Sequence, residues 1–220
     1  MTSPHPERDL VLTYAPAAGR PALAALLALD DALAQLLQTT REPALGQIRL
    51  AWWRERLADL DVKPPPAEPV LRGIADHVVS QGVSGASLAP IVDGWEVLLE
   101  EALDADALRR FGEGRGHLFV AAGSSSMGAG TDPLAEAGQG WALADLARHL
   151  GTVGDAEIAR DLARPLLQAA TTRRWSGRGR ALGAIAHLAL RDLDLPAGTP
   201  APIGSPGRLL RLIWFRLSGR

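Results

Sequence analysis

The stretch GQIRLAWWRE, residues 46–55, has the spacing of apolar residues that is typical of a helix, and most of the chain has the same periodicity. Pro43 suits the first turn of a helix, and apolar residues then recur at spacings of three to five residues. They are Leu45, Ile48, Trp52, Leu57 and Leu60. The prolines at 64–66 end the segment, because they have no amide hydrogen to donate and disfavour the α conformation in the preceding residue. We predict a helix from residue 43 to about residue 60, with this apolar row facing the core.

Two adjacent tryptophans, Trp52 and Trp53, stand among arginines in this segment. Adjacent residues on a helix point about 100° apart, so only one of the two rings faces the same core direction as Ile48. The other ring meets a second helix, a pocket or a partner, and the neighbouring arginines could stack on it or bind an anion. In the alternative, both rings belong to the core and the arginines are solvated. The candidate ligand or partner contacts are Arg49, Trp52, Trp53 and Arg54.

The rest of the chain has helical periodicity nearly throughout. Further helices are predicted at residues 21–38, 69–81, 87–103, 106–122, 133–150, 155–170, 180–190 and 206–217. No segment alternates apolar and polar residues in the way a half-buried strand does. We therefore expect an all-α bundle of eight or nine helices, forming a single domain over residues 1–220. The prolines at 64–66 are expected in a loop inside that bundle.

Composition and charge exclude several classes of protein. The 220 residues include 23 basic and 25 acidic side chains, which argues against a uniformly basic nucleic-acid-binding protein. The absence of cysteine excludes disulfides, zinc–cysteine sites and thiol catalysis. The longest uninterrupted apolar runs, such as residues 22–29, are too short to span a bilayer, and the N-terminus lacks the pattern of a signal peptide. We expect a soluble or peripheral cytoplasmic protein with no nucleic-acid partner.

Local motifs for phosphate or metal binding are weak. Residues 123–130 are rich in glycine and serine, but they lack a phosphate-binding lysine and follow a predicted helix, so an interhelical loop explains them better. The five histidines are scattered, and none lies four residues from another. A helical zinc site of the H-E-x-x-H type needs that spacing, so no metal is expected from the histidines.

The C-terminal quarter is basic: residues 160–220 hold eleven arginines and three aspartates. In its last predicted helix, Leu209, Ile213 and Leu217 share a face with Leu210 and Trp214. A short, basic, aromatic-bearing amphipathic helix is typical of a membrane-surface anchor or of a helix docked on a partner. An ordinary closing helix of the bundle is the alternative. The candidate membrane or partner contacts are Arg208, Arg211, Trp214, Phe215 and Arg216.

Residues 46–55 are similar to a segment of the squalene/phytoene synthase family. Around them, residues 14–30 resemble the family's first long helix, 111–116 the segment before its central helix, 138–148 its second active-site helix and 206–212 its closing segment. The resemblance implies an isoprenoid-synthase-like bundle around a central cavity. It also implies enzymes that join two prenyl diphosphates head to head. Their aspartates, repeated at i and i+4 on two facing helices, hold Mg²⁺ ions that bridge the departing diphosphate.

The sequence departs from the family at both aspartate motifs. Asp30 and Asp31 lie near the first motif, but its acidic positions are occupied by Ala34, Gln35 and Gln38. In the second motif, Asp145 stands where the family has asparagine, Arg148 matches the family's arginine, and His149 replaces the following aspartate. Asp145 is therefore expected to be alone on its helix face. Two-metal binding of a diphosphate is expected to be lost on both walls of the cavity.

These departures resemble a shorter, non-catalytic branch of the family that includes assembly factors of respiratory complex I. The resemblance implies a protein without catalysis, metal or other cofactor, which binds a protein partner or a lipid at the inner face of a membrane. Asp30, Asp31, Asp145 and Arg148 would then be the remnant of the diphosphate site. One alternative is an active prenyltransferase whose rearranged metal site holds Mg²⁺ with Asp30, Asp31 and Asp145. Another is an unrelated helical adaptor without a central cavity.

Overall fold

The computed structural model describes residues 6–125, 127–196 and 199–220, and these residues form helices and loops with no strand. The α-helices are α1 (Pro6–Leu12), α2 (Arg20–Thr39), α3 (Pro43–Asp59), α4 (Pro69–His77), α5 (Ala89–Glu96), α6 (Ala105–Ser124), α7 (Leu134–Leu146), α8 (Val153–Thr172), α9 (Arg180–Asp192) and α10 (Pro206–Ser218). Short 3₁₀ turns lie at Val79–Gln81, Ala86–Leu88 and Val97–Leu99. The all-α fold predicted from the sequence is confirmed.

The helix boundaries follow the local signals closely, with four differences. The segment predicted at 69–81 is an α-helix to His77 and a 3₁₀ turn at Val79–Gln81. Proline occupies the first turn of α3, α4 and α10, as the sequence indicates. The segment predicted at 87–103 contains the shorter α5, which tightens into a 3₁₀ turn before the extended Glu100. The segment predicted at 133–150 ends as a helix at Leu146. Helix α1 was not predicted, because seven residues are too few to show a helical period.

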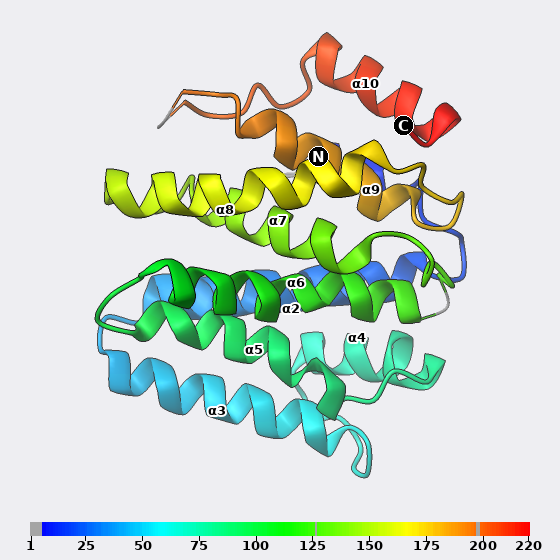
Figure 1. The fold of residues 1–220 in the computed structure, drawn as a ribbon. Coiled ribbons are helices and arrows are strands. Elements are labelled where there is room, and N and C mark those ends of the chain that lie inside the picture. The colour runs from blue at the N-terminus through cyan, green and yellow to red at the C-terminus, as the bar shows by residue number, and fades with distance from the viewer. Residues whose placement is uncertain (1–5, 126, 197–198) are drawn as a thin grey trace.

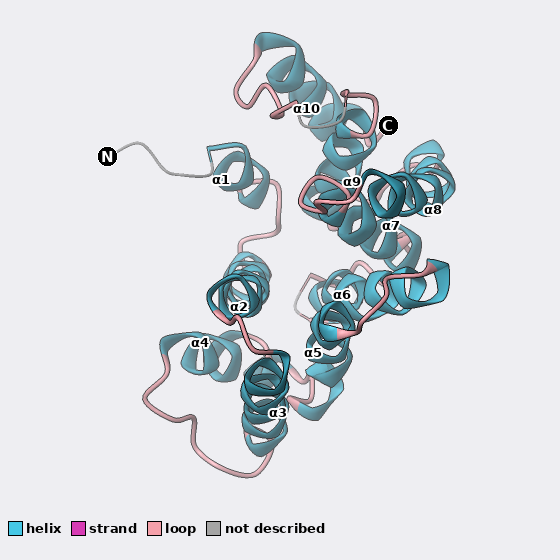
Figure 2. Ribbon diagram, turned by 90° about the vertical axis from the view of Figure 1, so that its left-hand side faces the viewer, coloured by secondary structure: helices cyan, strands magenta, loops and turns pink. Residues whose placement is uncertain are grey.

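The helices stack in an order that is not their chain order (Figure 1). Helix α3 lies at one end, followed by α4 and α5, by α2 and α6, and then by α7, α8, α9 and α10. In the end-on view, α1 and α2 lie across from α6, α7 and α9 (Figure 2). The buried apolar residues form one connected cluster that extends from Val11 to Phe215. The proline-rich loop after α3 leads into α4, which packs against α2.

Helix α2 is long and apolar enough, by length and composition, to cross a membrane. Half of the relevant window is buried inside the bundle, where Leu23, Leu26, Leu29 and Leu33 are fully inaccessible to solvent. A core helix passes the same test as a membrane span, and this burial accounts for the apolar character of α2. From the sequence we predict no segment long enough to span a bilayer, and α2 is an exception by length and composition. That prediction considers only uninterrupted apolar runs, whereas α2 is apolar on average over its whole length.

Candidate functional site

The path of α6 through the bundle is set by two glycines that flank Arg115. A Cβ at Gly114 would lie 2.6 Å from the Cα of Gly94 on α5, and one at Gly116 would lie 2.5 Å from the backbone nitrogen of Gln139 on α7. These glycines therefore let α6 pack closely against α5 on one side and α7 on the other. Because successive helix residues turn by about 100°, Arg115 points between these contacts, toward α2.

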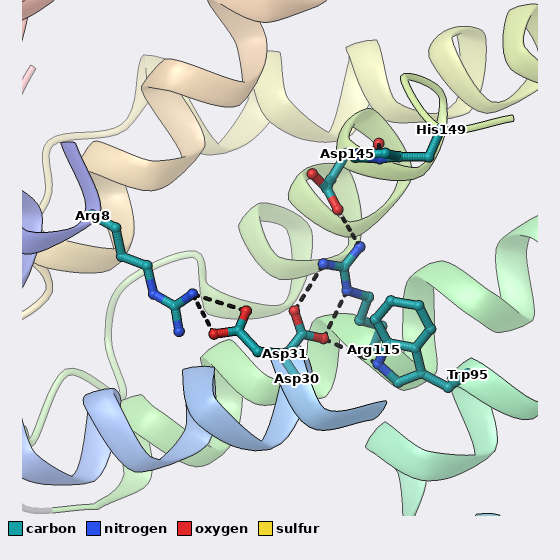
Figure 3. Close-up of polar contacts among 7 residues, drawn as sticks. All are labelled: Arg8, Asp30, Asp31, Trp95, Arg115, Asp145 and His149. Carbon is teal, nitrogen blue, oxygen red and sulfur yellow. Dashed lines mark hydrogen bonds and ion pairs between the residues drawn. The ribbon is translucent and has the colours of Figure 1, made fainter. Parts of the chain in front are cut away.

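Arg115 joins two aspartates from opposite walls of the bundle (Figure 3). Its Nε and Nη2 donate to Oδ1 and Oδ2 of Asp30 on α2, each at 2.8 Å, and its Nη1 donates to Oδ2 of Asp145 on α7 at 2.7 Å. The indole Nε1 of Trp95 adds a hydrogen bond of 3.0 Å to Oδ1 of Asp30. A bidentate arginine–carboxylate pair of this kind is both strong and geometrically restrictive. The guanidinium is therefore held at a fixed point between α2 and α7.

Two tryptophan rings lie against this guanidinium. Its central carbon lies 4.6 Å from the ring centroid of Trp95 and 4.4 Å from that of Trp141. A desolvated cation over an indole face gains roughly 2 kcal/mol. The tryptophans thus stabilise the charge of Arg115 in a place where little water reaches it.

The electrostatics favour the charged forms of Arg115 and Asp145. Burial by itself would lower the pKa of the Arg115 guanidinium, but the Asp30 and Asp145 carboxylates raise it above its ordinary value. Burial by itself would raise the pKa of the Asp145 carboxyl, but the nearby Arg115 lowers it below its ordinary value. Arg115 and Asp145 therefore remain charged at neutral pH.

The group forms part of the wall of a cavity of about 740 Å³. Most of the lining side chains are apolar and come from α2, α7, α9 and the segments after α5 and α9, including Leu27, Leu37, Leu98, Leu150, Ile185, Leu188 and Ile203. Ligand pockets are typically about 300–1,000 Å³ in volume, mostly apolar, with a few placed polar groups. The volume and the lining are therefore those of a small-molecule binding site.

A second charged group closes the same cavity where α1 meets α9 and α10. Arg208 is buried and donates from Nε and Nη2 to the two carboxylate oxygens of Glu7, both at 2.8 Å. It also donates to Asp192, whose other neighbour is Arg148 at 3.4 Å. Burial by itself would raise the pKa of the Glu7 carboxyl, but the hydrogen bonds from Arg208 and from the Gly204 amide, together with the charge of Arg208, leave this pKa lowered. Helix α1 is thus fastened across the bundle by ion pairs.

The carboxylates of the cavity do not suit the Mg²⁺ ions that the resemblance associates with this fold. Both carboxylate oxygens of Asp30 accept hydrogen bonds from Arg115, and so does one oxygen of Asp145. Asp31, the neighbour of Asp30, turns away and pairs with Arg8 at 2.7 Å. Across the described ranges, no three His, Cys, Asp or Glu residues gather in a way that could hold a metal ion. The guanidinium of Arg115 already lies between Asp30 on α2 and Asp145 on α7, as a cation that the chain itself supplies.

The squalene/phytoene synthase family model matches residues 5–164, well over half of the chain. The chain belongs to the squalene/phytoene synthase family. Comparisons with curated proteins and with solved structures gave no match. The matched range covers α1 to α7 and more than half of α8, so it includes Asp30, Arg115 and Asp145. The resemblance drawn from residues 206–212 lies outside that range.

Within this family member, the four residues predicted as a remnant diphosphate site all line the cavity. Asp30 is buried and Asp145 is 34% exposed, whereas the side chain of Asp31 is 57% exposed. Asp145 is isolated from other acids on α7, but it is not without a partner, because Arg115 reaches it from α6. Arg148 lies at the far side of the cavity, next to Asp192.

The predicted core face of α3 is wrong for Leu45, Ile48 and Trp52, which are exposed, and right for Leu57 and Leu60, which are buried. Ile48 is 67% exposed and Trp52 is 41% exposed, whereas Trp53 is buried together with Leu50 and Leu57. Helix α3 carries apolar residues on two faces, and its period alone does not show which one is buried. One tryptophan faces inward, as predicted, but it is not on the side of Ile48, and the alternative of two core rings is also wrong.

None of the four candidate residues on α3 lines the cavity. Arg54 pairs with Asp93 at 2.6 Å and with Glu96, which fastens α3 to α5. Arg49 donates to the Thr40 hydroxyl at 2.9 Å. These arginines are therefore structural contacts within the bundle, and contact with a separate partner stays a prediction for the exposed Trp52.

The prediction for the last helix is wrong for two of its five residues. Arg208 is buried in the ion pairs described above, and Phe215 is buried against the ring of His187. Arg211 is half-buried, with Nη2 lying 3.1 Å from Nδ1 of His187. Arg216 is exposed and lies over the Tyr14 ring at 5.1 Å. Trp214 is exposed, as an interaction surface requires.

Sequence reasoning missed the residue that organises the site. Arg115 falls within residues 111–116, which were noted only for their resemblance to the family. The available signal was an arginine placed between Gly114 and Gly116, because flanking glycines indicate close helix contacts on both sides. Glu7 and Trp141 gave no comparable signal.

Proposed function

We propose that this squalene/phytoene synthase family member is not a prenyltransferase and that it binds a lipid-like molecule in its cavity. The observation that carries the proposal is the Arg115 bridge between Asp30 and Asp145 (Figure 3). In the family, as the resemblance implies, metal ions held by such walls neutralise the departing diphosphate. Here an internal guanidinium pairs with both walls and offsets part of their charge, so their carboxylates have little capacity left for divalent cations.

Arg115 cannot replace the metal ions in the reaction. Its donors are directed at the two aspartates, and two tryptophan rings lie against its guanidinium. A diphosphate would have to break these ion pairs to reach it. Breaking a buried pair leaves an uncompensated charge, which costs about 3–5 kcal/mol. Ligand binding to the apolar part of the cavity needs no such change.

The test is a calorimetric titration of the protein with farnesyl diphosphate, with and without Mg²⁺, followed by analysis of the products after long incubation. We expect no Mg²⁺-dependent binding and no hydrocarbon product. Saturable binding that requires Mg²⁺, or turnover to a head-to-head product, would establish the alternative of an active prenyltransferase and end this proposal.

We also propose that α10 rests on an anionic membrane surface. Leu210, Ile213, Trp214 and Leu217 are exposed along one side of this helix, and Arg216 and Arg220 are exposed beside them. An apolar stripe with a tryptophan buries itself in the headgroup region, and neighbouring arginines add roughly 1 kcal/mol each on an anionic leaflet. Buried Arg208 and Phe215 hold α10 on the bundle, so the helix can present this stripe without detaching.

Flotation with phosphatidylglycerol vesicles tests the membrane contact. Trp214→Ser with Leu217→Ser should reduce flotation at least about fivefold, since two interfacial apolar side chains are lost. Ile48→Ser, which removes an equally exposed apolar residue on α3, is the matched control and should have no effect. Equal flotation of all three proteins, or of none, would favour a protein partner on α10. A role in respiratory-complex assembly stays a prediction, because it rests on the resemblance alone.

A further inference from the structure

We propose that the cavity selects an uncharged amphiphile, a molecule with an apolar chain and a hydroxyl or carbonyl head, over anionic lipids of the same chain. This inference rests on the proposed function and names the class of ligand. It follows from the charges that line the cavity and from the partners that each of them already has.

The apolar part of the cavity is suited to a hydrocarbon chain. Leucines and isoleucines from α2, from the segment after α5 and from α9 surround it, and Trp95 and Trp141 form part of the same wall. Burial of a chain in such a place gains roughly 25 cal/mol per Å² of apolar surface. This gain is the same for any head group, so the head group decides selectivity.

Every arginine that lines the cavity is paired with a carboxylate of the same cavity. Arg8 pairs with Asp31, Arg115 with Asp30 and Asp145, and Arg148 with Asp192. The fourth, Arg208, pairs with Glu7 and Asp192. Among the described residues, an anionic head would therefore find no arginine without a carboxylate partner, and it would lose its water without compensation, which is costly in an apolar environment.

The net charge of the lining also opposes an anion. Five acidic residues line the cavity, and four arginines face them. The acids are Glu7, Asp30, Asp31, Asp145 and Asp192. A diphosphate or a carboxylate would add negative charge to a wall that already has an excess of it, and charges close to one another in a partly buried site are screened little by salt.

Other hydrogen-bonding groups remain for the head of the ligand. Gln38 and His149 line the cavity and are exposed, and the Asp145 carboxylate is 34% exposed beside the Arg115 pair. The Nδ1 of His149 is 2.8 Å from the backbone oxygen of Asp145, which fixes the ring next to the cavity (Figure 3). Together they offer a donor and acceptors to a hydroxyl or carbonyl head.

The experiment compares two ligands that share one chain, farnesol and farnesyl diphosphate, each titrated calorimetrically with and without Mg²⁺. We expect farnesol to bind at least about tenfold more tightly than the diphosphate, a difference of about 1.4 kcal/mol. Equal or tighter binding of the diphosphate without Mg²⁺ would overturn the inference and leave the proposed function intact. Mg²⁺-dependent diphosphate binding would overturn the proposed function itself, and the absence of all binding would overturn both.

Two pairs of variants connect binding to this cavity. Ala34→Phe fills the cavity from α2 and should weaken farnesol binding, whereas Gln35→Phe adds the same ring at the next, exposed position and should not. Asp31→Asn releases Arg8 from its partner and should tighten the diphosphate about threefold, as expected for one exposed ion pair, with farnesol unchanged. Unchanged farnesol binding by Ala34→Phe would place the ligand elsewhere, and unchanged diphosphate binding by Asp31→Asn would refute selection by charge.

Discussion

Replacement of Asp30 by asparagine should destabilise the protein far more than the same change at the next residue. Asp30 is buried and accepts two hydrogen bonds from Arg115 and one from Trp95. Loss of its charge leaves the buried guanidinium with Asp145 alone. Removal of one partner from a buried ion pair costs about 3–5 kcal/mol, and the amide oxygen that asparagine retains places the expected loss near the lower value.

Asp31→Asn is the matched control, because it makes the same chemical change one residue away on α2. The Asp31 side chain is 57% exposed and pairs only with Arg8, so we expect a loss of about 0–1 kcal/mol. The measurement is the free energy of unfolding from urea titrations of both variants and the parent. Equal losses of unfolding free energy in the two variants would show that the Arg115 bridge does not stabilise the fold.

Three further predictions concern other parts of the molecule. Burial and, to a smaller extent, the positive charge of Arg211 lower the pKa of His187 to about 4. As the pH falls, the unfolded chain therefore binds a proton at this histidine before the folded protein does. Stability should therefore fall by about 3 kcal/mol between pH 6.5 and 4, and His187→Gln should flatten this fall in urea titrations across that range. Gly138→Ala places a methyl group against the backbone of α6 and should lower the free energy of unfolding by about 1–3 kcal/mol. The control is Gly73→Ala on α4, whose methyl group would meet Ala25 at 3.7 Å and should be neutral or stabilising. Thermal unfolding of both variants measures the difference. Glu7→Gln should speed amide hydrogen exchange throughout α1, because it weakens the pair with Arg208; unchanged exchange would mean that other contacts hold the helix.

Under the proposed function, the Arg115 bridge gives a physical reason for a family member to keep the fold without the metal ions. Two acidic walls that face each other across a bundle repel unless a cation lies between them. A guanidinium supplied by α6 meets this need without an external ion, and the glycines beside it let the helices approach closely enough for the reach of one side chain. The cavity is thereby preserved while its charge is compensated from within.

Local features of the sequence were enough to predict most of the helices. Prolines in first turns, apolar residues three or four positions apart and the proline run at 64–66 act over one or two helical turns, so their consequences can be predicted without knowledge of the fold. Loss of the aspartate repeats near Asp30 and Asp145 was likewise visible, because an i, i+4 spacing is a property of a single helix.

The tertiary structure alone decided which faces are buried and which charges meet. Helix α3 is apolar on two sides, and only its packing shows that Trp53 lies inside and Ile48 outside. Asp30 and Asp31 are adjacent in the sequence, yet one is buried beside Arg115, 85 positions away, and the other is exposed beside Arg8. Such pairings depend on the distance between helices that are remote in the chain, and no local pattern carries that distance.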